Sequence, residues 1–446
     1  MSGGIYGGDE VSGVVFDAGS HSFRVGFAGE EYPKFCNRNI LQGDIPSYVA
    51  VQEVEPDGDV EMKEGAEPDK NIKKKRNIFI GTTKIIVPRA KTTIQNFMKD
   101  GMSEYAKFAN GRTSGLVVDS GATHTSAVPV YDGYAVTHAV VRSPIGGDVI
   151  SEQLQYMLDE QNIEVVPTYK IGGKASVPCS SEEVNENEAP RWTKKKNLPE
   201  VTESYDKFMK KQILEDMAIS ILQLCDTPLD AEYAEKLPSA PYSFPNGFTK
   251  EFLAERIKVP EGLFDLKYLR NIPASQSTLL NVTQIATTAA GMCDIDIRPT
   301  LYSGLMVTGG NSLILGFTER LNHDLAHKCP PTIKLRVSAA PTPMERRFGA
   351  WIGGSILGSL GSFQQMWIAK SEYDETGRTI VENRGATAGP RFPDGSINWQ
   401  CPCMAGGSLV AHSCYNSSTK TPRGAECEEQ FMQQALCVKK YGGEKE

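Results

Sequence analysis

Two short segments share a pattern that suits phosphate chemistry, in which an apolar run of strand type ends in an aspartate and a glycine turn follows. They are Val14–Ser20, which contains Asp17, Gly19 and Ser20, and Leu116–Gly121, which contains Asp119 and Gly121. Backbone N–H groups in such a turn can surround an anion, and the aspartate can hold a hydrated divalent cation against the same phosphates. Taken alone, each turn is most often a plain hairpin. Because the pattern occurs twice, we expect a nucleotide clamped between two related halves.

A third glycine turn lies between a predicted strand and a predicted helix. Residues 305–308 are mostly apolar, Gly309, Gly310 and Asn311 follow, and residues 313–325 have the apolar spacing of a helix. A glycine pair here lets the backbone approach a flat ligand such as adenine or ribose, although a plain strand-to-helix turn has the same residues. Together the three turns indicate a nucleotide-binding ancestry.

The elements that must position these turns are visible as periodic apolar segments. Apolar residues recur at helical spacing from Tyr205 to Leu224, and residues 351–368 keep a helical period while their glycines allow another backbone to come close. Residues 50–80 pass from an acidic to a basic block with few large apolar residues, which predicts an exposed loop or hairpin. The basic runs Lys73–Arg76 and Lys194–Lys196 suit either a partner contact or a solvated surface, and the first also suits a nuclear-import signal.

Composition limits the class of protein. The chain has 446 residues, 40% of them hydrophobic, a formal charge of −8 and a pI near 5.5. This length supports two or more lobes of a soluble protein, and the acidic balance argues against general nucleic-acid binding by the whole chain. No apolar run approaches membrane-spanning length, so we expect the cytosol or the nucleus and no membrane partner. Half of the cysteines crowd the end of the chain, where we expect an irregular tail rather than a metal site; they are Cys401, Cys403, Cys414, Cys427 and Cys437.

Several segments resemble the actin family. The resemblance is carried by the two aspartate turns, by Thr308–Gly310, by Trp351–Leu357 (Trp-Ile-Gly-Gly-Ser-Ile-Leu) and by Phe363–Trp367, and it extends over residues 1 to about 383. Other segments resemble more closely one nuclear branch, the actin-related proteins of the fourth type, which supply the actin-like subunit of SWI/SNF-type remodellers. These segments are Gly3–Glu10, Ser120–Thr125, Phe244–Gly247, Pro260–Phe264 and Met292–Pro299.

The resemblance implies an α/β, actin-like, two-lobed fold, in which duplicated ribonuclease-H-like domains of strands and helices enclose a nucleotide cleft. We expect the first lobe at 1–145 plus 340–383, with 48–80 as a small subdomain, and the second lobe at 146–339. Residues 384–446 fall outside the resemblance and are expected to form an unrelated, irregular tail. The family has a long segment where this chain runs directly from residue 102 to 103, so the first lobe is expected to be truncated.

The resemblance also implies the site, with ATP and Mg²⁺ as cofactors. Asp17 and Asp119 match the family's metal-side aspartates, which act through water, and the other matches are the phosphate-loop residues Gly19, Ser20, Arg24 and Gly121, the adenosine-loop residues Gly309, Gly310 and Asn311, and the nucleoside-side residues Glu215 and Arg347. Two residues that conventional actin needs for hydrolysis are replaced, a carboxylate by Ala122 and a water-orienting histidine by Ser126. In the first loop His21 replaces a glycine and Arg24 replaces a lysine that faces phosphate. We therefore expect ATP binding without hydrolysis and no enzyme activity.

The function implied is that of a non-catalytic scaffold in nuclear chromatin-remodelling and histone-acetyltransferase complexes, acting in transcription regulation. The implied partners are actin, a helix of the remodeller ATPase, other complex subunits, and a nucleosome or histones. Two alternatives stay open. One is an ATP-binding cytoskeletal actin-like protein or weak ATPase, and the other is a phosphotransferase related to sugar kinases or chaperone ATPases, which share the aspartate turns.

Overall fold

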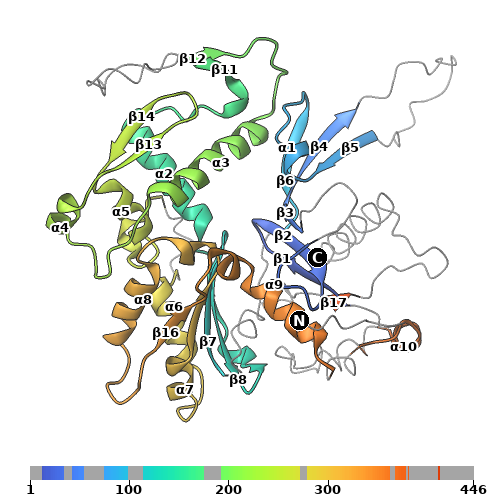
Figure 1. Ribbon diagram of the computed structural model, residues 1–446, viewed down its shortest axis with the longest axis vertical. Coiled ribbons are helices and arrows are strands. Elements are labelled where there is room, and N and C mark those ends of the chain that lie inside the picture. The colour runs from blue at the N-terminus through green and yellow to red at the C-terminus, as the bar shows by residue number, and fades with distance from the viewer. Residues whose placement is uncertain are drawn as a thin grey trace, which may run out of the picture.

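The computed structural model describes residues 13–34, 43–54, 75–98, 114–174, 192–271, 279–361, 367–377, 380 and 410–411. The architecture is mixed α/β, as predicted from the sequence. Figure 1 shows a larger group of elements, which includes β7, β8 and α3, and a smaller group around β1 and β4; α3 contacts β6 of the smaller group. None of the helices in these ranges combines the length and the apolar character needed to cross a membrane.

The larger group is built on a mixed sheet with strand order β10-β8-β7-β15-β16, and β9 also pairs with β8. Its strands are β7 (Gly115–Ser120), β8 (Thr125–Tyr131), β9 (Tyr134–Ala135), β10 (Val141–Ser143), β15 (Leu305–Thr308) and β16 (Val337–Ala339). Strand β15 runs parallel to β7 and pairs Thr308 with Asp119, so the second and third glycine turns leave the sheet at the same edge. The predicted lobe boundary at 145/146 separates strands that share this sheet, because β7, β8 and β10 precede it and β15 and β16 follow it.

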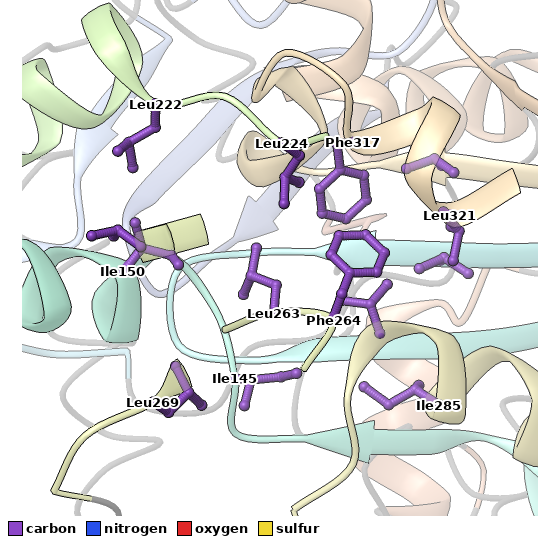
Figure 2. Packing of buried hydrophobic residues seen from close by; sticks show 14 of the residues in the cluster. Ile145, Ile150, Leu222, Leu224, Leu263, Phe264, Leu269, Ile285, Phe317 and Leu321 are labelled. Atoms are coloured by element: carbon purple, nitrogen blue, oxygen red, sulfur yellow. The ribbon is translucent and has the colours of Figure 1, made fainter. Parts of the chain in front are cut away.

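Helices and two hairpins surround this sheet. They are α2 (Gly147–Glu160), α3 (Glu203–Ile221), α4 (Ala231–Lys236), α5 (Glu255–Glu261), α6 (Val282–Gly291), α7 (Arg298–Ser303) and α8 (Phe317–Ala326), the turns η2 (Thr137–Ala139), η3 (Thr168–Lys170), η4 (Leu266–Tyr268) and η6 (Gly310–Leu313), and the pairs β11 (Ile171–Lys174) with β12 (Trp192–Lys194) and β13 (Ala240–Ser243) with β14 (Thr249–Phe252). Apolar residues of α2, α3, α5, α6, α7, α8, β13 and β14 join those of the sheet in one large buried cluster. Figure 2 shows Phe264 and Phe317 facing each other within it, and their ring centroids lie 5.2 Å apart. This burial supplies most of the rigid frame behind the glycine turns.

The smaller group contains two sheets. One has the order β17-β1-β2-β3, made of β1 (Val14–Ala18), β2 (Ser22–Phe27), β3 (Asp44–Pro46) and β17 (Val410–Ala411), and the other has the order β5-β4-β6, made of β4 (Tyr48–Val54), β5 (Lys75–Ile80) and β6 (Thr92–Asn96), with α1 (Thr82–Ile85) beside it. Helix α9 (Pro343–Ser359) packs on β1 and also contacts β15, so it joins this group to the larger one. Helix α10 (Lys370–Thr376) follows it.

Several predicted elements are confirmed and their ends are explained by local chemistry. The helix predicted over residues 205–224 is α3, where the Thr202 side chain caps the first turn. The helix predicted from residue 313 begins at Phe317, because Gly316 adopts a left-handed conformation with φ of 84°. Residues 50–80 contribute the β4–β5 hairpin, and residues 55–74 between its strands lie outside the described residues.

Two other predictions concern segments that the structure describes only in part. The basic run at 73–76 is described only from Lys75 onward, within β5, whereas Lys194 to Lys196 are exposed at and after β12. Of the predicted tail at 384–446 the structure describes only Val410 and Ala411, which pair with Val15 and Val14 of β1. The five terminal cysteines lie outside the described residues.

Candidate nucleotide cleft

All eleven predicted site residues line one cavity. Its volume is about 350 Å³, within the range of small-molecule pockets. It lies where the ends of β1, β7 and β15 meet the faces of α3 and α9. The predicted residues found there are Asp17, Gly19, Ser20, Arg24, Asp119, Gly121, Glu215, Gly309, Gly310, Asn311 and Arg347. Segments nearly 330 residues apart in sequence therefore converge, as the two-halves hypothesis requires.

The two aspartate turns have matching local geometry. The Gly19 N–H donates to the carbonyl of Ser22 at 3.1 Å, and the Gly121 N–H donates to the carbonyl of His124 at 3.0 Å. The turns also touch each other, because the hydroxyl oxygens of Ser20 and Thr123 lie 2.9 Å apart. The repeated sequence pattern thus corresponds to a repeated structure at the centre of the molecule.

The third turn is tied to the second by backbone geometry and by an amide. Gly309 has a φ of +89°, and a Cβ built on it would lie 2.3 Å from the Ser120 carbonyl oxygen and 2.4 Å from a carboxylate oxygen of Asp119. Only glycine fits this position without displacing the loop. Asn311 then donates through its side-chain amide to the Ser120 hydroxyl at 3.0 Å and to the Gly121 carbonyl at 2.8 Å.

A chain of charged side chains runs across the first sheet into the cavity. Arg24 donates to Asp17 at 2.6 Å, its Nε lies 3.6 Å from Asp44, and Asp44 accepts from Arg347 at 2.6 Å. The guanidinium groups of both arginines lie over the Phe348 ring, with their central carbons 5.3 Å and 5.5 Å from its centroid. Burial alone would lower the pKa of Arg24, but Asp17 and Asp44 raise it above the ordinary value, so the guanidinium stays charged.

The carboxyl group of Asp119 has its pKa raised to about 6. Burial is the largest cause, the negative charge of Asp17 raises the pKa further, and the positive charge of Arg24 lowers it. Asp17, by contrast, is buried in direct contact with a cation. The two predicted metal-side aspartates therefore have different electrostatic environments.

The nucleoside end of the cavity is also polar on one side. Glu215 of α3 lies 3.4 Å from Nδ1 of His21 and 3.8 Å from the ammonium group of Lys211. Burial would raise the pKa of Glu215, but these two neighbours lower it. Lys211 in turn donates to Asp148 of α2 at 2.8 Å and to the Tyr48 hydroxyl of β4 at 2.9 Å. His21 thus replaces a glycine with a side chain that faces Glu215 across the cavity.

The cavity contains residues that sequence reasoning missed. Ile219 and Leu313 give it an apolar side suited to an adenine ring, and Ile219 is 88% exposed. His124 also lines the cavity, with its Nδ1 2.8 Å from the Thr123 hydroxyl. The spacing of Lys211 and Glu215, four residues apart on one helix, was a signal that could have identified the lysine.

The structure also shows what stands at the replaced positions. Ala122 lines the cavity with a methyl group in place of a carboxylate. Ser126 lies in β8, is only 1% exposed, and its hydroxyl has no hydrogen-bond partner among the described residues. Neither residue can serve as a base toward a water molecule in the cavity.

The chain matches a known protein family over most of its length. The family model described as Actin matches residues 8–104 and 103–386. This chain belongs to the actin family. Among curated members of the family, it is 30% identical to actin-related protein 4 of Arabidopsis thaliana over 449 residues, covering 85% of this chain and 100% of that relative. It is 31% identical to actin-related protein 4 of Emericella nidulans over 470 residues, covering 85% of this chain and 97% of the relative.

Two other relatives give the same result. Actin-related protein 4 of Oryza sativa subsp. indica is 29% identical over 453 residues, and that of Yarrowia lipolytica is 29% identical over 428 residues. The predicted recognition of the actin family, and of the fourth type within it, is confirmed by these relatives. The mixed α/β structure is consistent with the actin fold.

Members of the actin family typically bind a nucleotide. The residues of this cleft can be compared with what a nucleotide needs and with what a magnesium ion needs. The cavity volume, the glycine pair at 309 and 310 and the apolar side at Ile219 and Leu313 fit a nucleotide. A magnesium ion held through water by both aspartates fits poorly. Asp17 is already in a 2.6 Å ion pair with Arg24, and the positive charge beside it opposes a second cation.

Proposed function

We propose that this protein is a non-catalytic actin-related subunit of nuclear chromatin-remodelling and histone-acetyltransferase complexes. Its support is the likeness to curated relatives named actin-related protein 4, which spans 85% of the chain. In this proposal the subunit works in the nucleus in transcription regulation. It pairs with actin along a helix of the remodeller ATPase, a form of recognition in which an amphipathic helix lies in a groove.

The observation that carries the non-catalytic part is the replacement of the carboxylate and the water-orienting histidine of conventional actin by Ala122 and Ser126. Phosphate hydrolysis needs a placed water and a group that accepts its proton, and the positions that would supply them hold Ala122 and the buried Ser126. The phosphate turns and Glu215 remain, so the cleft keeps groups for binding ATP. We infer that ATP serves as a structural ligand that holds the lobes together.

This part of the proposal is tested by phosphate release. The purified chain should release phosphate from ATP no faster than an Asp17→Ala variant. Release that is faster in the wild-type chain and is lost in the variant would support the alternative of a weak ATPase. Nucleotide-dependent pelleting on ultracentrifugation would support the cytoskeletal alternative.

We further propose that the chain lacks a segment of the family between Met102 and Ser103. The two stretches matched by the family model, residues 8–104 and 103–386, meet at this junction. The alignment with the Arabidopsis relative covers 85% of the 446 residues of this chain, which is about 379 residues, but it is 449 positions long. About 70 of its positions therefore have no residue of this chain opposite them. The family match ends at residue 386, so residues 387–446 lie beyond it.

The assembly proposal is tested by affinity purification of the tagged chain from nuclear extract, followed by mass spectrometry. A version with the missing segment restored is purified in parallel. Recovery of actin and a remodeller ATPase with this chain supports the proposal and shows that the shorter lobe assembles. Recovery with the restored version alone would limit the function to the longer form, and recovery with neither would refute the assembly proposal.

Histones in the same samples would identify a nucleosome contact, for which the exposed Lys194–Lys196 are the first candidates.

A further inference from the structure

Arg24 occupies a special position in the first sheet. Strand pairing places it directly opposite Asp17 on one side and directly opposite Asp44 on the other. A guanidinium group is thus buried between two carboxylates on neighbouring strands, an arrangement that cross-strand attraction favours. The equivalent position in the second hairpin, opposite Asp119, is Ser126, and the charge of Arg24 also acts on Asp119, where it lowers the pKa of the carboxyl group.

Its neighbours hold the guanidinium in place. The Phe348 ring lies beneath it, and Arg347 neutralises the far side of Asp44 through a 2.6 Å hydrogen bond. The hydrogen bond to Asp17 uses Nη1, and Nε is buried 3.6 Å from the Asp44 carboxylate. An arginine carries five N–H donors in a planar fork that matches phosphate oxygens, so the terminal nitrogens of Arg24, which lines the cavity, keep donors for a phosphate.

We propose that Arg24 takes the place of the divalent cation in this cleft, so that the phosphates of ATP bind to it without Mg²⁺. The inference rests on the proposed nucleotide site and deepens it. Magnesium in such sites is held by one or two carboxylates together with the substrate phosphates, and it needs a nearly ideal octahedron of oxygens. Here the Asp17 carboxylate is committed to the guanidinium, which supplies the positive charge without that geometric demand.

The test compares ATP binding with Mg²⁺ and with EDTA by isothermal titration calorimetry. For the wild-type chain the two dissociation constants should agree within about threefold. For Arg24→Gln, which leaves the acidic groups without their cation, ATP binding in EDTA should weaken by at least about tenfold, and Mg²⁺ should restore part of it. Arg24→Lys, which keeps the charge but loses the planar fork, should lie between the two and provides a readout if the glutamine variant fails to fold.

Arg270→Gln is the matched control, because this arginine pairs with Glu160 on the surface and lies away from the cleft. It should behave like the wild-type chain in both buffers. A wild-type chain that binds ATP at least about tenfold more weakly in EDTA would overturn the inference. Absence of ATP binding in both buffers would overturn it together with the nucleotide site, whereas the co-purification experiment decides the assembly proposal independently.

Discussion

Gly309 lies where the third turn comes closest to the second one. Gly309→Ala should weaken ATP binding strongly, because the new methyl group would collide with the Ser120 carbonyl 2.3 Å away and the backbone has a φ of +89°. The collision moves the third turn away from the second one. Measured by titration calorimetry with ATP, the loss should be at least about tenfold.

Gly291→Ala is the matched control for this experiment. Gly291 ends α6 away from the cavity and a Cβ built on it meets no atom within 4 Å, so this variant should keep the wild-type affinity. Equal losses in the two variants would contradict the proposed approach of the backbone at Gly309. An unchanged affinity in Gly309→Ala would show that the third turn does not contact the nucleotide.

Asp119 should make the stability of the protein depend on pH. Its pKa is raised from 3.8 to about 6, so the folded state disfavours the charged form. The folded protein binds this proton more tightly than the unfolded chain does, and the free energy of unfolding therefore falls as the pH rises from about 4 to about 6. Asp119→Asn removes this effect and should be more stable than wild type at neutral pH, by on the order of 2 kcal/mol.

Urea denaturation of both proteins across this pH range measures the difference. The advantage of Asp119→Asn should be complete above pH 6 and should vanish below about pH 4, where the wild-type carboxyl is protonated in both states. An advantage that stays constant from pH 4 to pH 7 would show that the titration of Asp119 is not its cause.

At this scale the sequence predicted which residues gather in the cleft but not how they pair. The aspartate and glycine motifs identified the turns because their chemistry is local. Asp44 could not be found in the same way, since it belongs to no motif and reaches Arg24 only through the register of β2 and β3. Ile219 also belongs to no motif, and its exposed side chain lines the cavity.

Among the elements, α9 is the one whose packing decides how the first sheet meets the rest. Its Trp351 is fully buried, and the indole N–H donates to the Val15 carbonyl of β1 at 3.0 Å. Trp351→Ala should lower the free energy of unfolding by about 3–5 kcal/mol, through lost burial and the cavity left behind. Trp351→Phe should cost less, about 1–3 kcal/mol, because the ring remains and chiefly the hydrogen bond is lost.

Ile356→Ala on the same helix is the control, since Ile356 is 37% exposed and should cost less than either tryptophan variant. Midpoints and slopes of urea denaturation give the three values. If Trp351→Ala were no more costly than Ile356→Ala, the contact between α9 and β1 would contribute little to the stability of the protein.

Helices could be predicted because the spacing of apolar residues that marks them occurs within one continuous segment of the sequence. The helix α3 follows from it, as does α8 except for its start, which Gly316 delays. The helix predicted over residues 351–368 agrees only in part with α9, which begins earlier, at Pro343, and ends at Ser359. The sheets were harder, because the parallel pairing of β7 with β15 joins strands almost 190 residues apart and no local pattern specifies it. This pairing explains why the lobe boundary predicted at 145/146 divides a continuous sheet.

In the whole molecule, α3 connects the β4–β6 sheet to the larger group. The Tyr205 hydroxyl of α3 donates to the Ile86 carbonyl at 2.5 Å, and Thr202, which caps the helix, donates to the Thr92 carbonyl at 2.5 Å. Buried residues of both sides form a separate hydrophobic cluster, with members Ala50, Ile85, Tyr169, Tyr205, Phe208 and Met209. Because Glu215 and Ile219 on the same helix line the cavity, this cluster links the position of the β4–β6 sheet to the nucleotide cleft.

Loosening this cluster should speed the release of bound nucleotide. Phe208 is 6% exposed and its ring lies 5.2 Å from the Tyr48 ring of β4, so Phe208→Ala weakens the contact across the cleft without touching the cavity. Such opening motions control ligand release in two-lobed proteins, and a loss of about 1.4 kcal/mol in the closed state corresponds to about tenfold faster release. Chasing a fluorescent ATP analogue with unlabelled ATP measures the rate.

Lys207→Ala is the control, because this side chain lies on the outer side of α3 and is 74% exposed; the variant should leave the release rate unchanged. Equal release rates in wild type and Phe208→Ala would mean that nucleotide leaves without separating α3 from the β4–β6 sheet.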